Sequence, residues 1–100
     1  MVADGMAVDE RRQLILFSRQ GCCLCEGLEQ RLRQLDLSRL GLDLQVIDID
    51  AAQTPSDWKT RYDLEVPVLT VGEKELPRVS PRLSADGLMS WLKRKLDDLD

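Results

Sequence analysis

The feature that most constrains this chain is a cysteine motif between a continuous apolar segment and a leucine pattern of helical spacing. The apolar segment is Leu14-Ile15-Leu16-Phe17, and the motif is Cys22-Cys23-Leu24-Cys25. The leucines of helical spacing are Leu24, Leu28, Leu32 and Leu35. A short continuous apolar run predicts a buried strand, whereas apolar residues three or four positions apart predict an amphipathic helix. The motif therefore lies where a buried strand leads into a helix.

This position favours thiol chemistry at Cys22. The first backbone N–H groups of a helix have no partner inside the helix, and the helix dipole is positive at that end. Both effects stabilise a thiolate, so the sequence predicts that the pKa of the Cys22 thiol lies below its ordinary value. A lowered pKa also makes Cys22 a good leaving group, which allows mixed disulfides formed on it to exchange rapidly.

Length and composition predict one small globular domain. The chain has 100 residues, of which 43% are hydrophobic and 32% charged, and its formal net charge is −4. It has no basic stripe with interleaved aromatic residues, which argues against a nucleic-acid partner. No apolar segment approaches membrane-spanning length, and the first residues lack the pattern of a signal peptide. We expect a cytoplasmic monomer with a loose tail at residues 1–12 and a folded domain at residues 13–100.

Hydrophobic patterning and turn residues predict four strands and three helices in the order βαβαββα. The predicted strands are residues 13–18, 44–50, 67–71 and 75–80, and the predicted helices are residues 23–36, 54–63 and 84–96. Gly41 marks the break after the first helix, and Thr54 is predicted to cap the second. The two strand–helix alternations imply parallel strands, and the last two strands imply an antiparallel hairpin.

This order, together with two motifs, resembles the thioredoxin fold and glutaredoxins in particular. In the first motif, from Phe17 to Cys25, Arg19 precedes the first cysteine by three positions. The second motif is Val66-Pro67, within a segment that resembles a subgroup of small glutaredoxin-like proteins. The resemblance covers roughly residues 13–96. It implies an α/β, thioredoxin-like fold with a four-stranded mixed sheet and helices on both faces.

Under this resemblance Cys22 and Cys25 are the catalytic dithiol couple. Cys25 lies one helical turn after Cys22, so it would expel a substrate from Cys22 and leave a Cys22–Cys25 disulfide. An alternative interpretation is that Cys25 is only a small apolar residue on the buried face of the helix. Cys23 occupies the position where glutaredoxins have proline. Two interpretations stay open for it: an accessory redox thiol, or an exposed side chain without a role.

The resemblance also assigns substrate binding to Arg19, Val66 and Pro67. It implies a cis peptide bond before Pro67, although a trans proline is also compatible with the first position of a strand. The backbone amide of Val66 would hydrogen-bond an incoming peptide or glutathione as an added strand does. Arg19 would pair with a carboxylate of the substrate.

Glutathione is a candidate co-substrate, and neither a metal nor a tightly bound cofactor is expected. The chain differs from the glutaredoxin pattern at Leu24, at Glu65, and at residues 84–87, where the segment that holds a glutathione carboxylate is missing. We expect Glu65 to repel an anionic ligand and Ser84 to cap the last helix. The expected partners are protein or low-molecular-weight disulfides, with glutathione or a thioredoxin-type protein as reductant.

Three functions agree with the sequence. The first is a cytoplasmic thiol–disulfide oxidoreductase, because clustered thiols that close almost no loop are rarely structural in a reducing compartment. The second is a non-catalytic interaction module on the same fold. The third is a dimer that shares thiols around a metal or an iron–sulfur cluster, since one chain with three cysteines and no histidine offers too few ligands.

Overall fold

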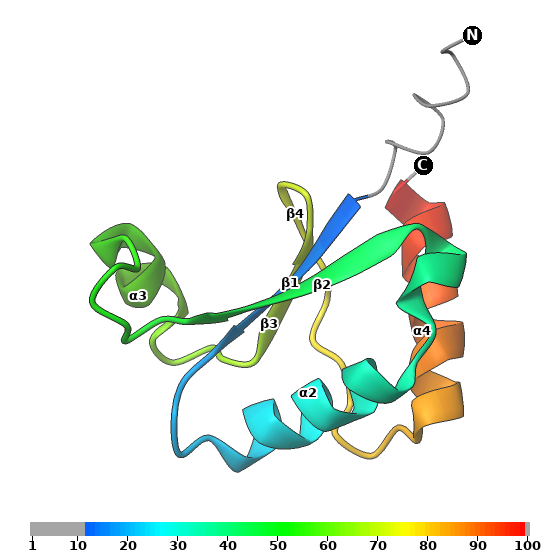
Figure 1. The fold of residues 1–100 in the computed structure, drawn as a ribbon, viewed down its shortest axis with the longest axis horizontal. Helices are drawn as coiled ribbons and strands as arrows, with labels where there is room; N and C mark the ends of the chain where they lie inside the picture. The colour runs from blue at the N-terminus through cyan, green and yellow to red at the C-terminus, as the bar shows by residue number, and fades with distance from the viewer. Residues whose placement is uncertain (1–11, 100) are drawn as a thin grey trace, which may run out of the picture.

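The computed structural model describes residues 12–99, whose secondary structure follows the predicted order (Figure 1). The elements are β1 (Arg12–Ser18), α2 (Cys23–Gln34), the 3-10 helix η1 (Leu37–Leu40), β2 (Leu42–Asp48), α3 (Ser56–Tyr62), β3 (Val68–Val71), β4 (Lys74–Glu75) and α4 (Ala85–Leu99). The predicted tail, residues 1–12, lies outside the described residues except for Arg12, which begins β1. None of the helices within residues 12–99 has the length and apolar character needed to cross a membrane.

The strands form one mixed sheet in the order β2-β1-β3-β4. β1 is parallel to β2, with Leu14 opposite Leu44, and antiparallel to β3, with Leu16 opposite Leu69. β3 and β4 form the predicted antiparallel hairpin. The mixed four-stranded sheet is confirmed, but the expectation that both strand–helix alternations give parallel strands is wrong for β3.

The short length of α3 explains the direction of β3. With seven residues, α3 spans about 10 Å, whereas the seven-residue strand β2 spans about 23 Å. The helix by itself therefore does not span the length of β2, and the chain does not return to the end of the sheet where β2 begins. Figure 1 shows α3 beyond the end of β2, so β3 enters the sheet from the end at which β2 leaves it.

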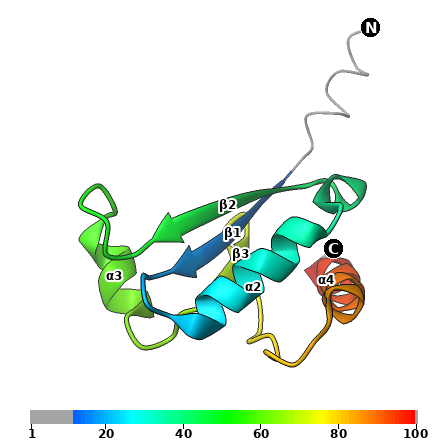
Figure 2. The ribbon, with the colours of Figure 1, turned by 60° about the horizontal axis from the view of Figure 1, so that its bottom comes forward.

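Helices cover both faces of the sheet, as predicted. α2 and α4 pack together on the face toward which Leu14 and Leu16 of β1 point (Figure 2). α3 lies on the opposite face, where Tyr62 joins a buried cluster with Phe17 and Val68. Successive residues of a strand point to opposite faces, so this arrangement buries β1 on both sides.

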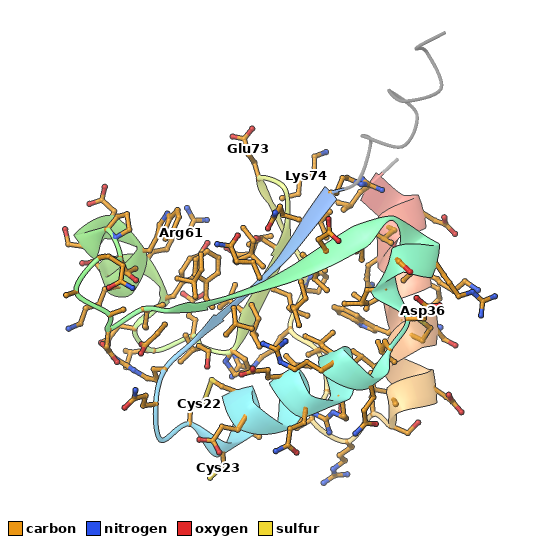
Figure 3. The ribbon with its side chains drawn as sticks, in the orientation of Figure 1. Cys22, Cys23, Asp36, Arg61, Glu73 and Lys74 are labelled. Carbon is orange, nitrogen blue, oxygen red and sulfur yellow. A yellow bond between two sulfur atoms is a disulfide. The ribbon has the colours of Figure 1, made fainter. Side chains whose placement is uncertain are left out.

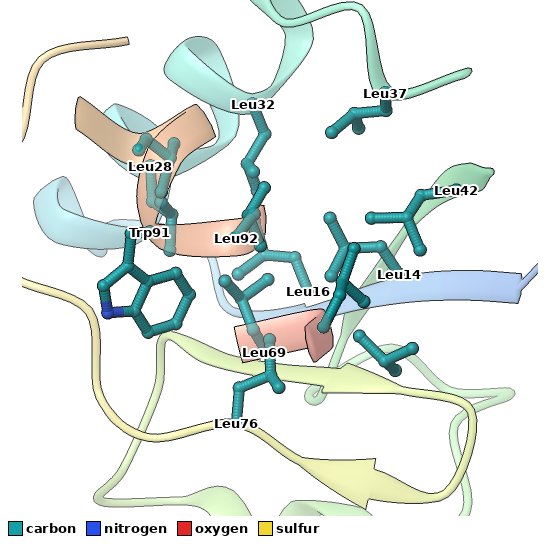
Figure 4. Close-up of a cluster of buried hydrophobic side chains, with 13 residues drawn as sticks. Leu14, Leu16, Leu28, Leu32, Leu37, Leu42, Leu69, Leu76, Trp91 and Leu92 are labelled. Atoms are coloured by element: carbon teal, nitrogen blue, oxygen red, sulfur yellow. The ribbon is translucent and has the colours of Figure 1, made fainter. Parts of the chain in front are cut away.

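The larger core lies between the sheet and the pair of helices α2 and α4, and it consists mainly of leucine (Figure 4). Leu32 of α2 and Leu92 of α4 are fully buried there. The predicted leucine pattern of α2 is confirmed at Leu28 and Leu32. It is wrong at Leu24, which is 49% exposed, because Cys25 takes the buried position in the first turn.

The start of α3 differs from the prediction. Pro55 is the N-cap residue, the helix begins at Ser56, and no side chain caps it. The Thr54 hydroxyl instead donates a 2.7 Å hydrogen bond to the carbonyl oxygen of Asp48, the last residue of β2. Thr54 therefore fixes the loop after β2 and does not cap the helix.

The segment between β4 and α4 is mostly irregular. The fourth strand, predicted over residues 75–80, contains only Lys74–Glu75. Pro77 has no amide hydrogen with which to continue the ladder. At the far end of the segment, the Ser84 hydroxyl accepts a 3.1 Å hydrogen bond from the Gly87 amide, so the predicted cap of the last helix is confirmed.

We expect Leu92→Ala to lower the free energy of unfolding by about 2–5 kcal/mol, because it removes a fully buried side chain and leaves a cavity. Equilibrium unfolding in urea measures this change. The matched control is Leu64→Ala, since Leu64 is 92% exposed and its truncation should cost less than about 0.5 kcal/mol. Equal losses in the two variants would contradict the position of Leu92 in the core.

Candidate redox site

The loop between β1 and α2 brings the cysteine motif to the start of a helix. Gly21 has a φ of 79°, in the left-handed region that favours glycine, and this turn directs the chain into α2. Cys22 is the N-cap residue with extended backbone angles, and Cys23 is the first helical residue. The predicted position of Cys22 at the amino-terminal end of the helix is confirmed.

Cys22 and Cys25 form a disulfide across the first turn of α2. Their Cα atoms are 5.2 Å apart, and the Cys25 amide donates a 3.2 Å hydrogen bond to Cys22 Sγ. Cys22 is half-buried, whereas Cys25 is fully buried. Of the two sulfur atoms, that of Cys22 is therefore the one that an external thiol can approach.

Cys23 is exposed and forms no disulfide. Figure 3 shows it on the outer surface at the start of α2, next to Cys22. An exposed position is compatible with an accessory thiol and with a side chain that has no role, so both interpretations of Cys23 stay open.

The loop between α3 and β3 contains the expected cis peptide bond between Val66 and Pro67. Pro67 lines the same surface groove as Leu24, so the loop lies beside the cysteine motif. The Val66 amide donates a 3.2 Å hydrogen bond to the Tyr62 carbonyl oxygen within the turn that follows α3. The contact of this amide with a substrate stays a prediction, and it would require the amide to leave its present partner.

Arg19 joins three loops at this end of the sheet. Its Nε and Nη2 atoms donate to the two carboxylate oxygens of Asp50 at 3.0 and 2.9 Å. Its Nη1 donates to the Asp63 carbonyl oxygen at 2.7 Å, and its Nη2 lies 2.9 Å from Asp63 Oδ1. Arg19 follows β1, Asp50 follows β2 and Asp63 precedes β3, so one guanidinium holds the three loops together.

These contacts compensate the charge of Arg19. Its hydrogen bonds with Asp50 and Asp63 raise the pKa of the guanidinium, and the bond with Arg19 lowers the pKa of the Asp50 carboxyl. A substrate carboxylate would have to compete with two carboxylates that are already in contact with Arg19. The pairing of Arg19 with a substrate carboxylate stays a prediction, and the geometry of Arg19 does not favour it. Asp50 and Asp63 were not among the predicted site residues.

Aromatic side chains anchor the loop that carries Pro67. The ring of Tyr62 packs against the ring of Phe17 with 4.5 Å between centroids, and Trp58 meets the Phe17 ring edge-on at 5.4 Å. Burial raises the pKa of the Tyr62 hydroxyl. These contacts hold α3 against the sheet, and the loop that follows α3 is thereby positioned near the disulfide.

The part of the chain that the structure describes contains no candidate metal centre. Within it, no group of three or more histidine, cysteine, aspartate or glutamate side chains is arranged to hold an ion. A site assembled from the thiols of two chains, as the iron–sulfur alternative requires, stays a prediction.

A family model matches most of the chain. It describes the glutaredoxin-like domain (DUF836), and the match covers residues 13–93. The chain belongs to this glutaredoxin-like family. The matched region includes the Cys22–Cys25 disulfide and the Val66–Pro67 bond, so it contains both motifs on which the resemblance depends. No protein with a curated function matches this glutaredoxin-like chain.

Solved structures confirm the thioredoxin-like fold. Protein Ne2328 from Nitrosomonas europaea is 32% identical, with a TM-score of 0.56, over 82% of this chain and 92% of that one. A mutant thioredoxin from Halobacterium salinarum is 20% identical, with a TM-score of 0.59, over 93% and 81%. Mitochondrial thioredoxin 3 from Saccharomyces cerevisiae is 14% identical, with a TM-score of 0.55, over 92% and 84%. The family and the disulfide together support a redox role.

We expect Arg19→Gln to raise the pKa of Asp50 toward its ordinary value of 3.8, because the hydrogen bonds that lower it are lost. A carboxylate whose pKa is lowered by folding stabilises the fold above its ordinary pKa, and this contribution is lost as the pH falls through the lowered value. Below pH 3.8, the stability of the wild-type protein should therefore fall more steeply than that of the variant. NMR titration of the Asp50 carboxylate and urea unfolding at several pH values measure the two effects.

Arg33→Gln is the matched control for this experiment. Arg33 pairs with Glu29 on the surface of α2 at 2.9 Å, so its loss should leave the Asp50 titration unchanged. An Asp50 titration in the Arg19→Gln protein identical to that of the wild type would refute the role of Arg19 in joining the loops.

Proposed function

We propose that this glutaredoxin-like chain is a cytoplasmic thiol–disulfide oxidoreductase that works through Cys22 and Cys25. The observation that carries the proposal is the disulfide across the first turn of α2, in which Cys22 is half-buried and Cys25 is fully buried. Membership of the glutaredoxin-like family supports it. A cysteine pair that cycles between a dithiol and a disulfide needs this difference in burial, because one sulfur must meet the substrate while the other stays shielded from it.

The reduced protein would transfer two electrons to a substrate disulfide in two exchange steps. First, the Cys22 thiolate attacks one substrate sulfur, so the substrate S–S bond breaks and a mixed disulfide forms. The other substrate sulfur leaves as a thiolate and takes up a proton. The Cys25 thiol then loses its proton and attacks Cys22, which releases the second substrate thiolate and forms the Cys22–Cys25 disulfide. A thiol reductant, such as glutathione or a thioredoxin-type protein, restores the dithiol.

The start of α2 favours Cys22 as the attacking group. The Cys25 amide already donates to the Cys22 sulfur at 3.2 Å, and the positive end of the helix dipole faces the same atom. Both interactions favour a thiolate, so the pKa of the Cys22 thiol in the reduced protein should lie below its ordinary value. Cys25 has no such exposure and can react only with a group that is already bound to Cys22.

The loop that carries Val66 and Pro67 is the proposed docking edge for the substrate. The Val66 amide is occupied by the Tyr62 carbonyl oxygen, whereas no hydrogen bond among residues 12–99 uses the Val66 carbonyl oxygen. An extended peptide bound to Cys22 can donate to that carbonyl in the way that an added strand does. Protein disulfides and glutathione disulfide both contain amide N–H groups of this kind.

We expect Cys25→Ser to accumulate a mixed disulfide on Cys22, because the thiol that releases the substrate is missing. Reduced Cys25→Ser protein is mixed with a peptide disulfide, and intact mass spectrometry with peptide mapping locates the adduct. Cys22→Ser should lower the rate of disulfide reduction by roughly a hundredfold or more, since the nucleophile is lost.

Cys23→Ser is the matched control, because it removes the neighbouring exposed thiol and leaves the disulfide pair intact. The rate at which the Cys23→Ser protein reduces a disulfide shows whether Cys23 has an accessory role. A Cys22→Ser protein as active as the wild type would defeat the proposal, and the non-catalytic interaction module would take its place.

The pH dependence of alkylation provides a second test. In the reduced protein, the rate at which iodoacetamide modifies Cys22 should reach half its plateau at a lower pH than in an unfolded peptide of residues 18–27. Only the folded protein has the helix end that stabilises the thiolate. Coincident pH profiles for the protein and the peptide would show that the helix does not activate Cys22.

A further inference from the structure

A groove with two arginines lies beside the redox disulfide. It runs between α2, the loop of Pro67, and the segment of residues 76–84 that leads to α4 and passes beside α2 in Figure 2. Its apolar lining includes Leu24 and Val79, and its arginines are Arg31 and Arg78. Leu24 follows Cys22 by two residues and Pro67 follows Val66, so the groove adjoins both parts of the proposed substrate site.

Each of these arginines is held in position by one backbone carbonyl group. Arg31 Nη1 donates to the Pro81 carbonyl oxygen at 2.8 Å, which fixes the segment before α4 against α2. Arg78 Nη1 donates to the Glu65 carbonyl oxygen at 3.0 Å, which fixes the same segment against the loop of Pro67. A guanidinium has five N–H donors, so each arginine keeps further donors for a ligand. The Arg31 Nε atom is buried and has no hydrogen-bond partner.

Neither arginine is neutralised by a carboxylate of the described residues. Arg19, Arg33 and Arg61 pair with aspartate or glutamate side chains at 2.9–3.2 Å. Arg31 and Arg78, in contrast, donate hydrogen bonds only to carbonyl oxygens within residues 12–99. Two cations in the lining of one largely apolar groove, with no carboxylate in that lining, favour an anionic group as the ligand.

Two glutamates line a hollow next to the groove but not the groove itself. Glu65 and Glu75 line an adjacent hollow, which shares Pro67, Arg78 and Val79 with the groove but does not include Arg31. An anion is therefore favoured in the groove that contains Arg31, and it is disfavoured in the adjacent hollow.

We propose that Arg31 and Arg78 bind an acidic side chain of a peptide substrate whose disulfide reacts with Cys22. This inference rests on the proposed function. When Cys22 attacks the peptide disulfide, the peptide S–S bond breaks, its cysteine becomes bonded to Cys22, and its second sulfur leaves as a thiol after taking up a proton. A chain that then follows Val66 and Pro67 carries the side chain next to its cysteine over Leu24 and toward the two guanidinium groups.

The test uses two synthetic peptide disulfides that differ only by glutamate or glutamine beside the cysteine. The rate constant for their reduction by the reduced full-length protein is measured at low and high ionic strength. We expect the wild-type protein to reduce the glutamate peptide about fivefold faster, and we expect this preference to shrink at high salt. Arg78→Gln and Arg31→Gln should each reduce the ratio of the two rate constants, glutamate peptide over glutamine peptide, toward unity.

Arg82→Gln is the matched control, since it removes an exposed cation from the same segment without altering the groove lining. The Arg82→Gln protein should reduce the glutamate peptide faster than the glutamine peptide by the same factor as the wild type. If Arg31→Gln fails to fold, Arg78→Gln still tests the inference, because Arg78 is exposed. Equal rates for the two peptides, or a preference that survives the loss of both arginines, would overturn the inference. Faster reduction of glutathione disulfide than of the glutamate peptide would also overturn it. If neither peptide were reduced, the proposed function itself would fail.

Discussion

The central strand β1 is the constraint on which the rest of the structure depends. It bonds to β2 on one edge and to β3 on the other, and its side chains are buried on both faces. Leu16 points toward α2 and α4, and Phe17 packs against Tyr62. Because neighbours on four sides hold this strand, the loop after it starts from a rigid point. The first turn of α2 and its disulfide thereby receive a defined position relative to the sheet.

Around this rigid strand, arginines connect the loops that form the candidate site. Loops expose their backbone and cannot be fixed by apolar burial alone, so charged hydrogen bonds hold them here. Arg19 joins three loops and is fully compensated by Asp50 and Asp63. Arg31 connects α2 to the segment before α4, and Arg78 connects that segment to the loop of Pro67. Both do so through carbonyl oxygens, so no carboxylate offsets their charge. The difference in partners separates a structural arginine from one that is available to a ligand.

Much of the fold is predictable from local patterns. The apolar run before the cysteines, the leucines of α2 and the β-branched residues of the second strand each specify an element, because side-chain periodicity reflects burial on one face. The direction of β3 was not predictable in this way, since it depends on where a short helix leaves the chain. Leu24 and Thr54 were misassigned because each has a tertiary alternative: Leu24 adjoins a groove, and Thr54 bonds to Asp48.

The sequence by itself determined the order of elements, the position of Cys22 at a helix start, and Cys25 as its partner one turn later. These are local properties, since a helix brings residues three apart together wherever it lies. Only the tertiary structure decided the partners of the charged residues. Arg19, Arg31 and Arg78 look alike in the sequence, and which of them meets a carboxylate depends on segments that are 13 to 50 residues apart in the chain. Electrostatic pairing depends on distance in space, and the packing of the helices on the sheet sets that distance.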